Sequence, residues 1–458
     1  MVSSTLKEVL GKGPFIPITH LMFADDLLLF TRSSHEELGA VLNCLEIYQS
    51  WAGQVVNTQK SSIFFSHNLN LGIKRTLCNI SGFKTGDPSS EYLGLPLAFN
   101  RSKKHLFENV VEKIKAKTQG WKCKVLSQAA RITLAQSVLS LIPMYSMTSI
   151  SLPKSICSQI DTSIRNFIWG YTDSGRVHPL FSWNKVCKPK QAGGLGLRKA
   201  SDFNNALLAK LGWMIISDMG NEWIKLLKTK YLRGQSFLKA SPSSSHSWLW
   251  KGILGAKNTL QKGVCYLVGT GDSIRIWEDP WIPSIENFSP ISSGDITSPY
   301  LVVDLMTEDR LHWDTNKLNS LFDPSIAQAI LKIHLSAAHP QDKIIWAPNK
   351  SGNFSVKSAY IQAQLPSIQN TGPLHRKEWK KLWKLKIHER FKLLLWKIAW
   401  DILPTRDFLS KKWNIEDNDC PFCSSKPETC EHLFFGYPFA IIIWSLSPWP
   451  LNLINMNA

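Results

Sequence analysis

Two apolar runs, residues 21–23 and 27–30, flank the adjacent carboxylates Asp25 and Asp26. The pattern predicts two short buried strands that meet at a tight turn, with both carboxylates at its tip. Like charges placed beside apolar runs are costly unless a cation or water balances them. Magnesium is the natural candidate, because this hard cation prefers carboxylate oxygens. Aspartate is also a common turn residue, so an ordinary hairpin turn is the alternative.

The next segment, residues 33–53, has the apolar spacing of an amphipathic helix. Ser33 or Ser34 is the expected N-cap, and Glu36 and Glu37 suit the first turn, where the helix dipole favours negative charge. The apolar face consists of Leu38, Val41, Leu42, Leu45 and Tyr48. Three later segments, at 55–56, 63–65 and 92–97, are predicted as strands that close a small sheet with the hairpin.

Residues 102–141 are predicted to be helical and rich in lysine. Gly120-Trp121 breaks this segment into two helices, and the second stops near Pro143, because proline cannot continue a helix. A further helix is expected to end at Gly170. The apolar positions of the first two helices are Leu106, Val110, Val111, Ile114, Ala129, Ile132, Leu134, Val138 and Leu141.

Residues 193–197 form the glycine-rich run Gly-Gly-Leu-Gly-Leu. The run lacks the Lys-Ser/Thr ending of a phosphate-binding loop and does not fit G-x-G-x-x-G, so we expect no nucleotide site there. Nearby tryptophans could stack on bases, but packing in a core is the favoured interpretation. They include Trp213, Trp223, Trp248 and Trp250.

Residues 349–352 supply the turn of a predicted hairpin, and a helix is expected to start at Ser358 or a neighbour. A stripe at three- and four-residue spacing then predicts one buried helix face, made of Trp383, Ile387, Phe391, Leu394 and Ile398. Trp396 falls outside the centre of this stripe, as do Lys384, Lys386 and Lys392. A basic helix with an exposed indole suits a nucleic-acid backbone and a stacked base, and a solvated face is equally compatible.

A cluster of possible metal ligands lies near the C-terminus. Cys420 and Cys423 are separated by two residues, a spacing that lets both sulfurs point inward from one tight knuckle and form half of a tetrahedral zinc site. Cys430 and His432 follow. A single cysteine pair does not specify zinc by itself, so the case depends on the further ligands.

Composition and charge favour a polyanionic partner. The 458 residues are 44% hydrophobic, enough for roughly two to four domains with their own cores. Fifty-three Lys and Arg against 35 Asp and Glu give a net charge of +18, which suits nucleic acid. Most of the excess lies in residues 101–134 and 374–413, although each stretch could also be a solvated helix face.

The nine cysteines are an odd number, and most are scattered without a repeating interval. This usage favours reduced intracellular thiols over a secreted disulfide framework. Residues 1–7 lack the apolar core of a signal peptide, and no run of about 18 apolar residues occurs. We therefore expect an intracellular protein, in the nucleus or the cytoplasm, with no membrane partner and no small-molecule cofactor.

The segment from His20 to Phe30 resembles the metal-binding F/Y-A-D-D hairpin of reverse transcriptases. The next palm segment of non-LTR, LINE-type retrotransposon enzymes is resembled by Trp51, Gly53, Asn57 and Lys60, and their primer-grip turn by Tyr92-Leu93-Gly94. The resemblance implies that Asp25 and Asp26 hold Mg²⁺ beside the primer terminus. It also implies that Lys60 lies near the phosphates of the incoming nucleotide and that Tyr92, Leu93 and Gly94 hold the primer.

Residues 121–127 and Arg131 resemble the thumb signature of the plant members of that family. Residues 183–187, 193–197 and 271–281 resemble their connecting region. By this resemblance the thumb grips the backbone of a duplex formed by an RNA template and a DNA primer, which needs only positive charge within reach. The candidate phosphate-binding residues are Lys113, Lys115, Lys117, Lys122 and Arg131.

The C-terminal segment resembles the reverse-transcriptase zinc-binding domain of plant LINE-like proteins, C-x-x-C followed by H-L-F-x-x-C-P. Cys420, Cys423 and His432 match presumed Zn²⁺ ligands, but Tyr437 stands where the family has its last cysteine. A phenol with a pKa near 10 is a poor substitute. We expect Cys430 as the fourth ligand, because residues two apart on an extended segment point to the same side, with water as the alternative.

Together these features predict an α+β, multi-domain protein. The expected parts are a truncated palm of β-hairpin and helix (1–100), a helical thumb (101–170), a mixed connecting region (171–340), a small zinc-binding domain (341–445) and a tail (446–458). The expected function is that of the C-terminal part of an RNA-directed DNA polymerase. Only 24 residues precede Asp25, too few for the fingers and the third palm carboxylate, so we expect no polymerase activity from this chain alone. A non-catalytic nucleic-acid-binding remnant is the alternative.

Overall fold

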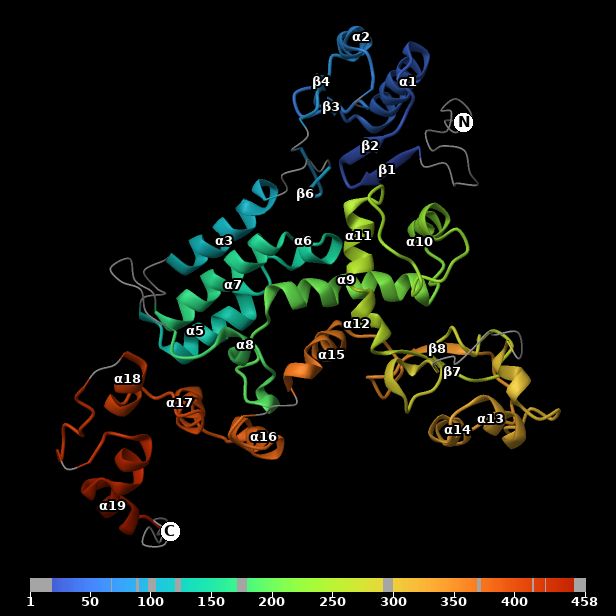
Figure 1. Ribbon diagram of the computed structural model, residues 1–458. Coiled ribbons are helices and arrows are strands. Elements are labelled where there is room, and N and C mark those ends of the chain that lie inside the picture. Colours follow the sequence, from blue (N-terminus) through green and yellow to red (C-terminus); the bar gives the residue numbers. More distant parts are fainter. Residues whose placement is uncertain are drawn as a thin grey trace. The chain divides into compact units, whose positions relative to one another are not determined.

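The computed structural model describes residues 19–66, 68–87, 90–97, 104–119, 125–170, 179–290, 300–368, 372–413, 416–424 and 426–448. It combines many helices with small sheets, which confirms the α+β class (Figure 1). The chain divides into two compact units. Unit 1 comprises Met1–Asn109, Ser149–Pro153 and Leu208–Phe354, and unit 2 comprises Val110–Thr148, Lys154–Leu207 and Ser355–Ala458. The five consecutive domains expected from the sequence remain a prediction.

Strands β1 (His20–Phe23) and β2 (Asp26–Leu29) form the predicted antiparallel hairpin in unit 1, with Phe23 opposite Asp26. The prediction that these strands are buried is wrong, because Met22 and Phe23 are 68% and 63% exposed. Among the described residues, β1 and β2 pair only with each other. A two-stranded sheet buries little of its own side-chain surface, so its apolar residues stay open to solvent.

Helix α1 (His35–Ala52) confirms the predicted helix and its N-cap. The Ser34 hydroxyl accepts a hydrogen bond from the Glu37 amide at 3.2 Å. The Glu37 carboxylate does more than complement the helix dipole. It is buried and accepts hydrogen bonds from the Thr31 hydroxyl at 2.7 Å and the Arg32 amide at 2.8 Å. Glu37 therefore ties the end of the hairpin to the first turn of α1.

The strands after α1 do not join the hairpin in one sheet, which corrects the prediction. β3 (Ser62–Ile63) and β4 (Lys84–Thr85) pair in parallel on either side of helix α2 (Leu71–Ser81) in the chain, and β5 (Glu91–Tyr92) pairs with β6 (Leu95–Pro96). Residues 55–56 lie outside any strand. Strands of two residues offer few backbone groups for a further partner, so the region consists of separate two-stranded sheets.

The rest of unit 1 combines helices with a fourth sheet. β7 (Val264–Leu267) pairs antiparallel with β8 (Lys343–Trp346). The turn at Asn349–Gly352 forms as predicted, but β8 pairs with β7 rather than with the segment after the turn. The helices are α10 (Glu222–Leu227), α11 (Trp248–Gly255), α12 (Lys257–Gln261), α13 (Thr315–Leu321) and α14 (Pro324–Leu331), with shorter helical turns at Lys228–Leu232, Glu286–Phe288 and Val302–Leu305.

Tryptophans form much of the core of unit 1, as predicted. Trp250, Trp281 and Trp346 are fully buried. The ring of Trp213 contacts Trp346 edge-on and stacks on Phe354, with centroids 6.1 Å and 5.8 Å apart. The aliphatic part of the core includes Ile274, Ile276, Ile282, Val302, Leu305, Leu318 and Ile330.

A single carboxylate, Asp342, orders the loop that follows β7. Its two oxygens accept hydrogen bonds from the amides of Gly269 at 2.8 Å, Gly271 at 2.9 Å and Ser273 at 3.0 Å, and from the Ser273 hydroxyl at 2.8 Å. Desolvation raises the pKa of Asp342, but these hydrogen bonds to the ionised form outweigh it, so the net pKa lies below its usual value.

Unit 2 is helical. Its helices are α3 (Glu108–Gln119), α5 (Gln128–Leu134), α6 (Met144–Ser149), α7 (Lys154–Trp169), α8 (Trp183–Val186), α15 (Val356–Ile368), α16 (Arg376–Lys384), α17 (Glu389–Ala399), α18 (Arg406–Trp413) and α19 (Pro438–Ser445). Helix α9 (Ala200–Ile216) begins in unit 2 and ends in unit 1. The predicted break after α3 falls on residues 120–124, outside the described residues. The predicted end of α7 at Gly170 is confirmed.

Residues 188–196, here called the glycine loop, contact tryptophan side chains of the C-terminal helices. Trp396 and Trp400 both donate their indole N–H to the Gly193 carbonyl, each at 2.8 Å. Gly194 has no room for a side chain, because a Cβ there would lie 1.9 Å from a carbonyl oxygen of the same loop. The glycines therefore allow close packing of the backbone.

The stripe predicted as one buried helix face is wrong. The helical structure is interrupted at residues 385–388, between α16 and α17. The five residues of the stripe therefore do not lie on one helix. Ile387 and Phe391 are 41% and 46% exposed, whereas Leu393 and Trp396 are buried. Trp396, predicted as an exposed indole for base stacking, is fully buried because its polar edge is satisfied by the glycine loop.

We predict that Asp342→Asn destabilises the protein by about 1–3 kcal/mol at pH 7, because an amide nitrogen cannot accept the hydrogen bonds from Ser273. Asp342 has a lowered folded pKa, so its contribution is present above its unfolded pKa and is lost as the pH falls through the folded value. Denaturant unfolding of parent and variant at pH 7 and at falling pH below 5 measures both effects.

The matched control is Asp323→Asn, which changes an N-cap aspartate whose side chain makes no capping hydrogen bond. If Asp342→Asn costs no more than this control at pH 7, the carboxylate does not hold the loop.

Candidate metal centre and nucleic-acid interface

Cys420 and Cys423 lie on a tight turn after α18, as the spacing predicted. The Cys420 amide donates to the Lys426 carbonyl at 2.9 Å, and the Ser424 amide donates back to the Cys420 carbonyl at 2.8 Å, so the turn closes on itself. His432 is the first residue of η8, a π-helical turn that spans His432–Gly436. Single π-helical turns are frequent at functional sites.

The structure brings three of the predicted ligands together. One ligand atom from each of Cys420, Cys423 and His432 lies within 4.8 Å of the others, and the Cys423 sulfur is 3.3 Å from His432 Nε2. Cys420 is fully buried and His432 is 8% exposed, whereas Cys423 is half-buried. Zinc ligands lie about 2.0–2.3 Å from the metal, so atoms with these separations can surround one ion.

Among the described residues, the second ring nitrogen of His432 lacks the hydrogen bond that usually accompanies a metal-binding histidine. Nδ1 is buried and has no hydrogen-bond partner among the described residues. A neutral imidazole that binds a metal through Nε2 carries its proton on Nδ1. Metal-binding histidines usually donate that proton to an acceptor that fixes the ring, and here the described residues supply none. The set is therefore compatible with zinc but lacks part of the usual support.

The fourth expected ligand, Cys430, is not part of this group. Cys430 is buried and lies near the Asp401 carboxylate. Desolvation, followed by the Asp401 charge, raises the pKa of Cys430 to about 11. A buried thiol held in its protonated form beside a carboxylate is a poor zinc ligand. Cys430 therefore lies outside the group of Cys420, Cys423 and His432, which counts against it as the fourth ligand.

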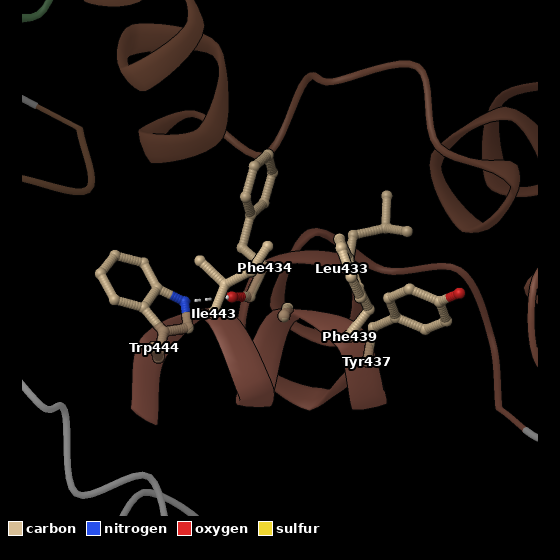
Figure 2. A pocket seen from close by; sticks show the side chains of 7 residues that line it. Leu433, Phe434, Tyr437, Phe439, Ile443 and Trp444 are labelled. Carbon is tan, nitrogen blue, oxygen red and sulfur yellow. Dashed lines mark hydrogen bonds between the residues drawn. The ribbon is translucent and has the colours of Figure 1, made fainter. Parts of the chain in front are cut away.

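Tyr437, which the resemblance aligns with the family's last cysteine, directly follows η8. Its ring meets His432 edge-on, with centroids 6.2 Å apart, and packs near Phe422 at 5.7 Å. Tyr437 also lines an apolar pocket of about 280 Å³ between η8 and α19 (Figure 2). The other lining residues are Leu433, Phe434, Phe439, Ala440, Ile443 and Trp444. Tyr437 thus packs against the ligand set, and no thiolate occupies its position.

Asp25 and Asp26 are adjacent at the β1–β2 turn. Asp25 forms the two-residue turn with Ala24, and Asp26 begins β2 opposite Phe23. Both carboxylates are exposed, so water can solvate them, and the argument that their burial demands a cation is wrong. Ala24 adopts φ 52°, a strained conformation that hairpin turns usually give to glycine. The hairpin therefore stores strain at the residue next to the carboxylates.

The other palm candidates lie on separate elements. Lys60 is exposed in a turn after α1, where its amide donates to the Asn57 side chain at 3.1 Å. Tyr92 belongs to β5, and Leu93 and Gly94 form the β5–β6 turn with φ 50° and 72°. Two successive positive φ angles are typical of a tight type I′ turn, so the primer-grip motif does form a sharp hairpin. It belongs to a different two-stranded sheet from Asp25.

The thumb candidates fall into two groups. Lys113, Lys115 and Lys117 are exposed on α3, as a phosphate-binding role requires. The guanidinium of Arg131 donates to two carbonyls, that of Leu126 before α5 at 3.1 Å and that of Phe167 near the end of α7 at 3.4 Å. Its role in binding nucleic acid remains a prediction. Lys122 lies outside the described residues.

One basic surface, the exposed side of α16, was not predicted as a separate element. The pattern predicted a basic stretch at 374–413 with one buried helix face from Trp383 to Ile398, whereas α16 ends at Lys384. The signal was present as two tryptophans four residues apart, with the cations between and around them. The exposed cations are Arg376, Lys377, Lys380, Lys381 and Lys384.

Among the described residues, no helix has both the length and the apolarity to cross a membrane.

Comparison with known proteins agrees with this geometry. Residues 354–444 match the family described as zinc-binding in reverse transcriptase, and this range contains Cys420, Cys423 and His432. A putative ribonuclease H protein of Arabidopsis thaliana is 30% identical over 359 residues, which cover 76% of this chain and 57% of that protein. The chain thus spans little more than half the length of that relative.

An uncharacterized mitochondrial protein of Arabidopsis thaliana is also 30% identical, over 152 residues that cover 33% of this chain and 99% of that protein. Nearly the whole of that relative is therefore represented here. The chain belongs to the reverse-transcriptase-related proteins and carries their zinc-binding domain.

Proposed function

We propose that this chain is the C-terminal, template-primer-binding part of an RNA-directed DNA polymerase from a LINE-type element of plants. The observation that carries the proposal is the zinc-binding match, with its Cys-Cys-His group assembled at 354–444. The Asp-Asp hairpin and the sharp turn at Leu93-Gly94 support it, because each motif forms the local structure that the resemblance requires. A chain that handles template and primer would act in the nucleus or the cytoplasm.

In this proposal Asp25 and Asp26 bind Mg²⁺ at the primer terminus. Their exposure allows a cation to reach them, and a hard divalent ion prefers such oxygens. Phosphoryl transfer by paired metal ions needs ligands for both ions. The family's third palm carboxylate has no counterpart in the motifs of these 458 residues, so the two aspartates would need a carboxylate from outside them.

The alternative is a nucleic-acid-binding remnant without catalysis. Two observations favour it over a working zinc domain: Tyr437 stands where the resemblance places the last cysteine, and Cys430 lies outside the group of Cys420, Cys423 and His432. Such a chain would still bind nucleic acid through its net charge of +18.

We predict that this chain alone does not extend a DNA primer on an RNA template in the presence of Mg²⁺. Two carboxylates cannot position both metal ions of the transfer reaction. Gel-resolved primer extension with the 458-residue chain, and with Asp25→Ala as background control, is the measurement. Extension above that background would show that the chain supplies the missing ligand itself.

We predict that the chain binds duplex DNA without sequence preference and with steep salt dependence. Each phosphate neutralised adds about 0.9 to the slope of log affinity against log salt. Replacing Lys113, Lys115 and Lys117 with Gln removes up to three phosphate contacts. The magnitude of the slope should therefore fall by up to about 2.7. An unchanged slope in fluorescence anisotropy titrations would return these lysines to an ordinary solvated face.

We predict that the chain binds zinc through Cys420, Cys423 and His432, with water in the fourth position. Tyr437→Cys should tighten binding by at least about tenfold, since even the loss of an outer-shell partner costs about 10–100-fold. Cys430→Ala should leave the affinity unchanged, because Cys430 lies outside the group of Cys420, Cys423 and His432. Competition with a chromophoric chelator measures all three affinities.

A drop in affinity for Cys430→Ala would instead make Cys430 the fourth ligand. If neither the parent nor Tyr437→Cys retains metal, these residues do not form a zinc site.

A further inference from the structure

Helix α16 presents an unusual density of positive charge. Five of its nine residues are exposed Lys or Arg, and its only acidic residue is Glu378. The opposite side of the helix carries Trp379, which is fully buried, and Trp383, which is half-buried. The helix is therefore amphipathic, with indoles on one side and cations on the other.

The indoles fix the orientation of the helix within unit 2. Trp383 donates its indole N–H to the Lys190 carbonyl at 3.1 Å, and Trp379 stacks on Trp400 with centroids 5.9 Å apart. Trp400 is in turn bonded to Gly193 of the glycine loop. Because the apolar side is held against this loop, the cationic side is kept facing solvent.

Within the described residues the cations of α16 form no ion pairs, whereas some cations of the next two helices do. Lys392 of α17 pairs with Glu389, and Lys411 of α18 pairs with Asp407, each at 2.7 Å. Within the described part of the chain, none of the ion pairs involves an α16 cation. The Glu378 carboxylate accepts a hydrogen bond from the His375 amide at 2.7 Å and so caps the helix. Glu378 is thus the one acidic residue of the helix, and its carboxylate caps the N-terminus.

We infer that α16 binds the phosphate backbone of a nucleic acid, as a second contact of the template-primer partner that the proposed function assigns. Lys377 and Lys381 lie one turn apart, about 6 Å along the helix axis, as do Arg376 and Lys380. Four of the five cations are lysines, which act on phosphates as point charges and need no fixed geometry. The surface therefore suits a row of phosphates.

The same contacts exclude base recognition by this surface. Trp379 is buried, and the Lys190 ammonium lies 4.9 Å from the Trp383 ring centroid. One face of Trp383 is thus covered by a cation and its edge is bonded to the loop, so it is not a free platform for a stacked base. Phosphate contacts alone carry no sequence information. Binding through α16 is backbone binding without base preference.

The test replaces Lys377, Lys380 and Lys381 with Gln in the full chain and measures binding to a fluorescent DNA duplex between about 50 and 200 mM NaCl. The slope of log affinity against log salt should fall by up to about 0.9 for each contact removed. The parent should bind two duplexes of unrelated sequence with equal affinity. The variant should also bind these two duplexes with affinities equal to each other.

The matched control removes the same charge from paired lysines, by replacing Lys225, Lys228 and Lys411 with Gln. An equal loss in this control would show that net charge, not α16, is responsible, and would overturn the inference. Circular dichroism and the thermal midpoint report whether each variant is folded, and a single Lys381→Gln variant repeats the test if the triple variant is not.

The outcomes separate this inference from the proposed function. If the α16 variant binds as the parent does while the Lys113, Lys115 and Lys117 variant loses affinity, the α16 contact is wrong and the proposed function stands. If the parent binds no nucleic acid at these salt concentrations, the proposed function itself fails.

Discussion

The carbonyl group of Gly193 is the contact on which the arrangement of unit 2 depends. It accepts two indole N–H groups, one from Trp396, which is fully buried, and one from Trp400, which is half-buried. A buried indole without an acceptor would cost free energy, and two converging on one oxygen fix the position of α17 against the glycine loop. The two ends of the glycine loop can lie close together because Gly194 has no side chain, whereas a Cβ there would collide with the Lys188 carbonyl.

This contact links the zinc-binding match to a segment that lies far from it in the sequence. The tryptophans at 379, 383, 396 and 400 lie within residues 354–444, whereas the glycine loop lies far earlier in the chain. The glycine loop, whose composition resembles that of a phosphate-binding loop, therefore accepts hydrogen bonds from indole N–H groups. Trp379 and Trp383 of α16 pack in the same region, with Trp383 bonded to the glycine loop. Because the indole side of α16 is held there, its cations face solvent.

Cys420, Cys423 and His432 form a group that is compatible with zinc, and Tyr437 stands where the resemblance places a fourth ligand. Cys420, Cys423 and His432 remain grouped because the closed turn and η8 position them through backbone hydrogen bonds, independently of Tyr437. Tyr437 keeps a packing role beside His432. Cys430 is only two residues from His432, but in η8 and the residues before it the backbone is helical, so alternate side chains do not share a face as they would on an extended segment.

The sequence by itself determined the local elements: the Asp25-Asp26 hairpin, the cap of α1 at Ser34, the end of α7 at Gly170 and the Cys-x-x-Cys turn. These depend on hydrogen bonds and φ preferences between near neighbours, which short motifs encode. Only the tertiary structure decided which side chains are buried and which partners they meet. Trp396 is buried, Arg131 joins two helices and Phe23 is exposed because each outcome depends on elements distant in sequence, and a periodic pattern shows that a face is apolar without showing what covers it.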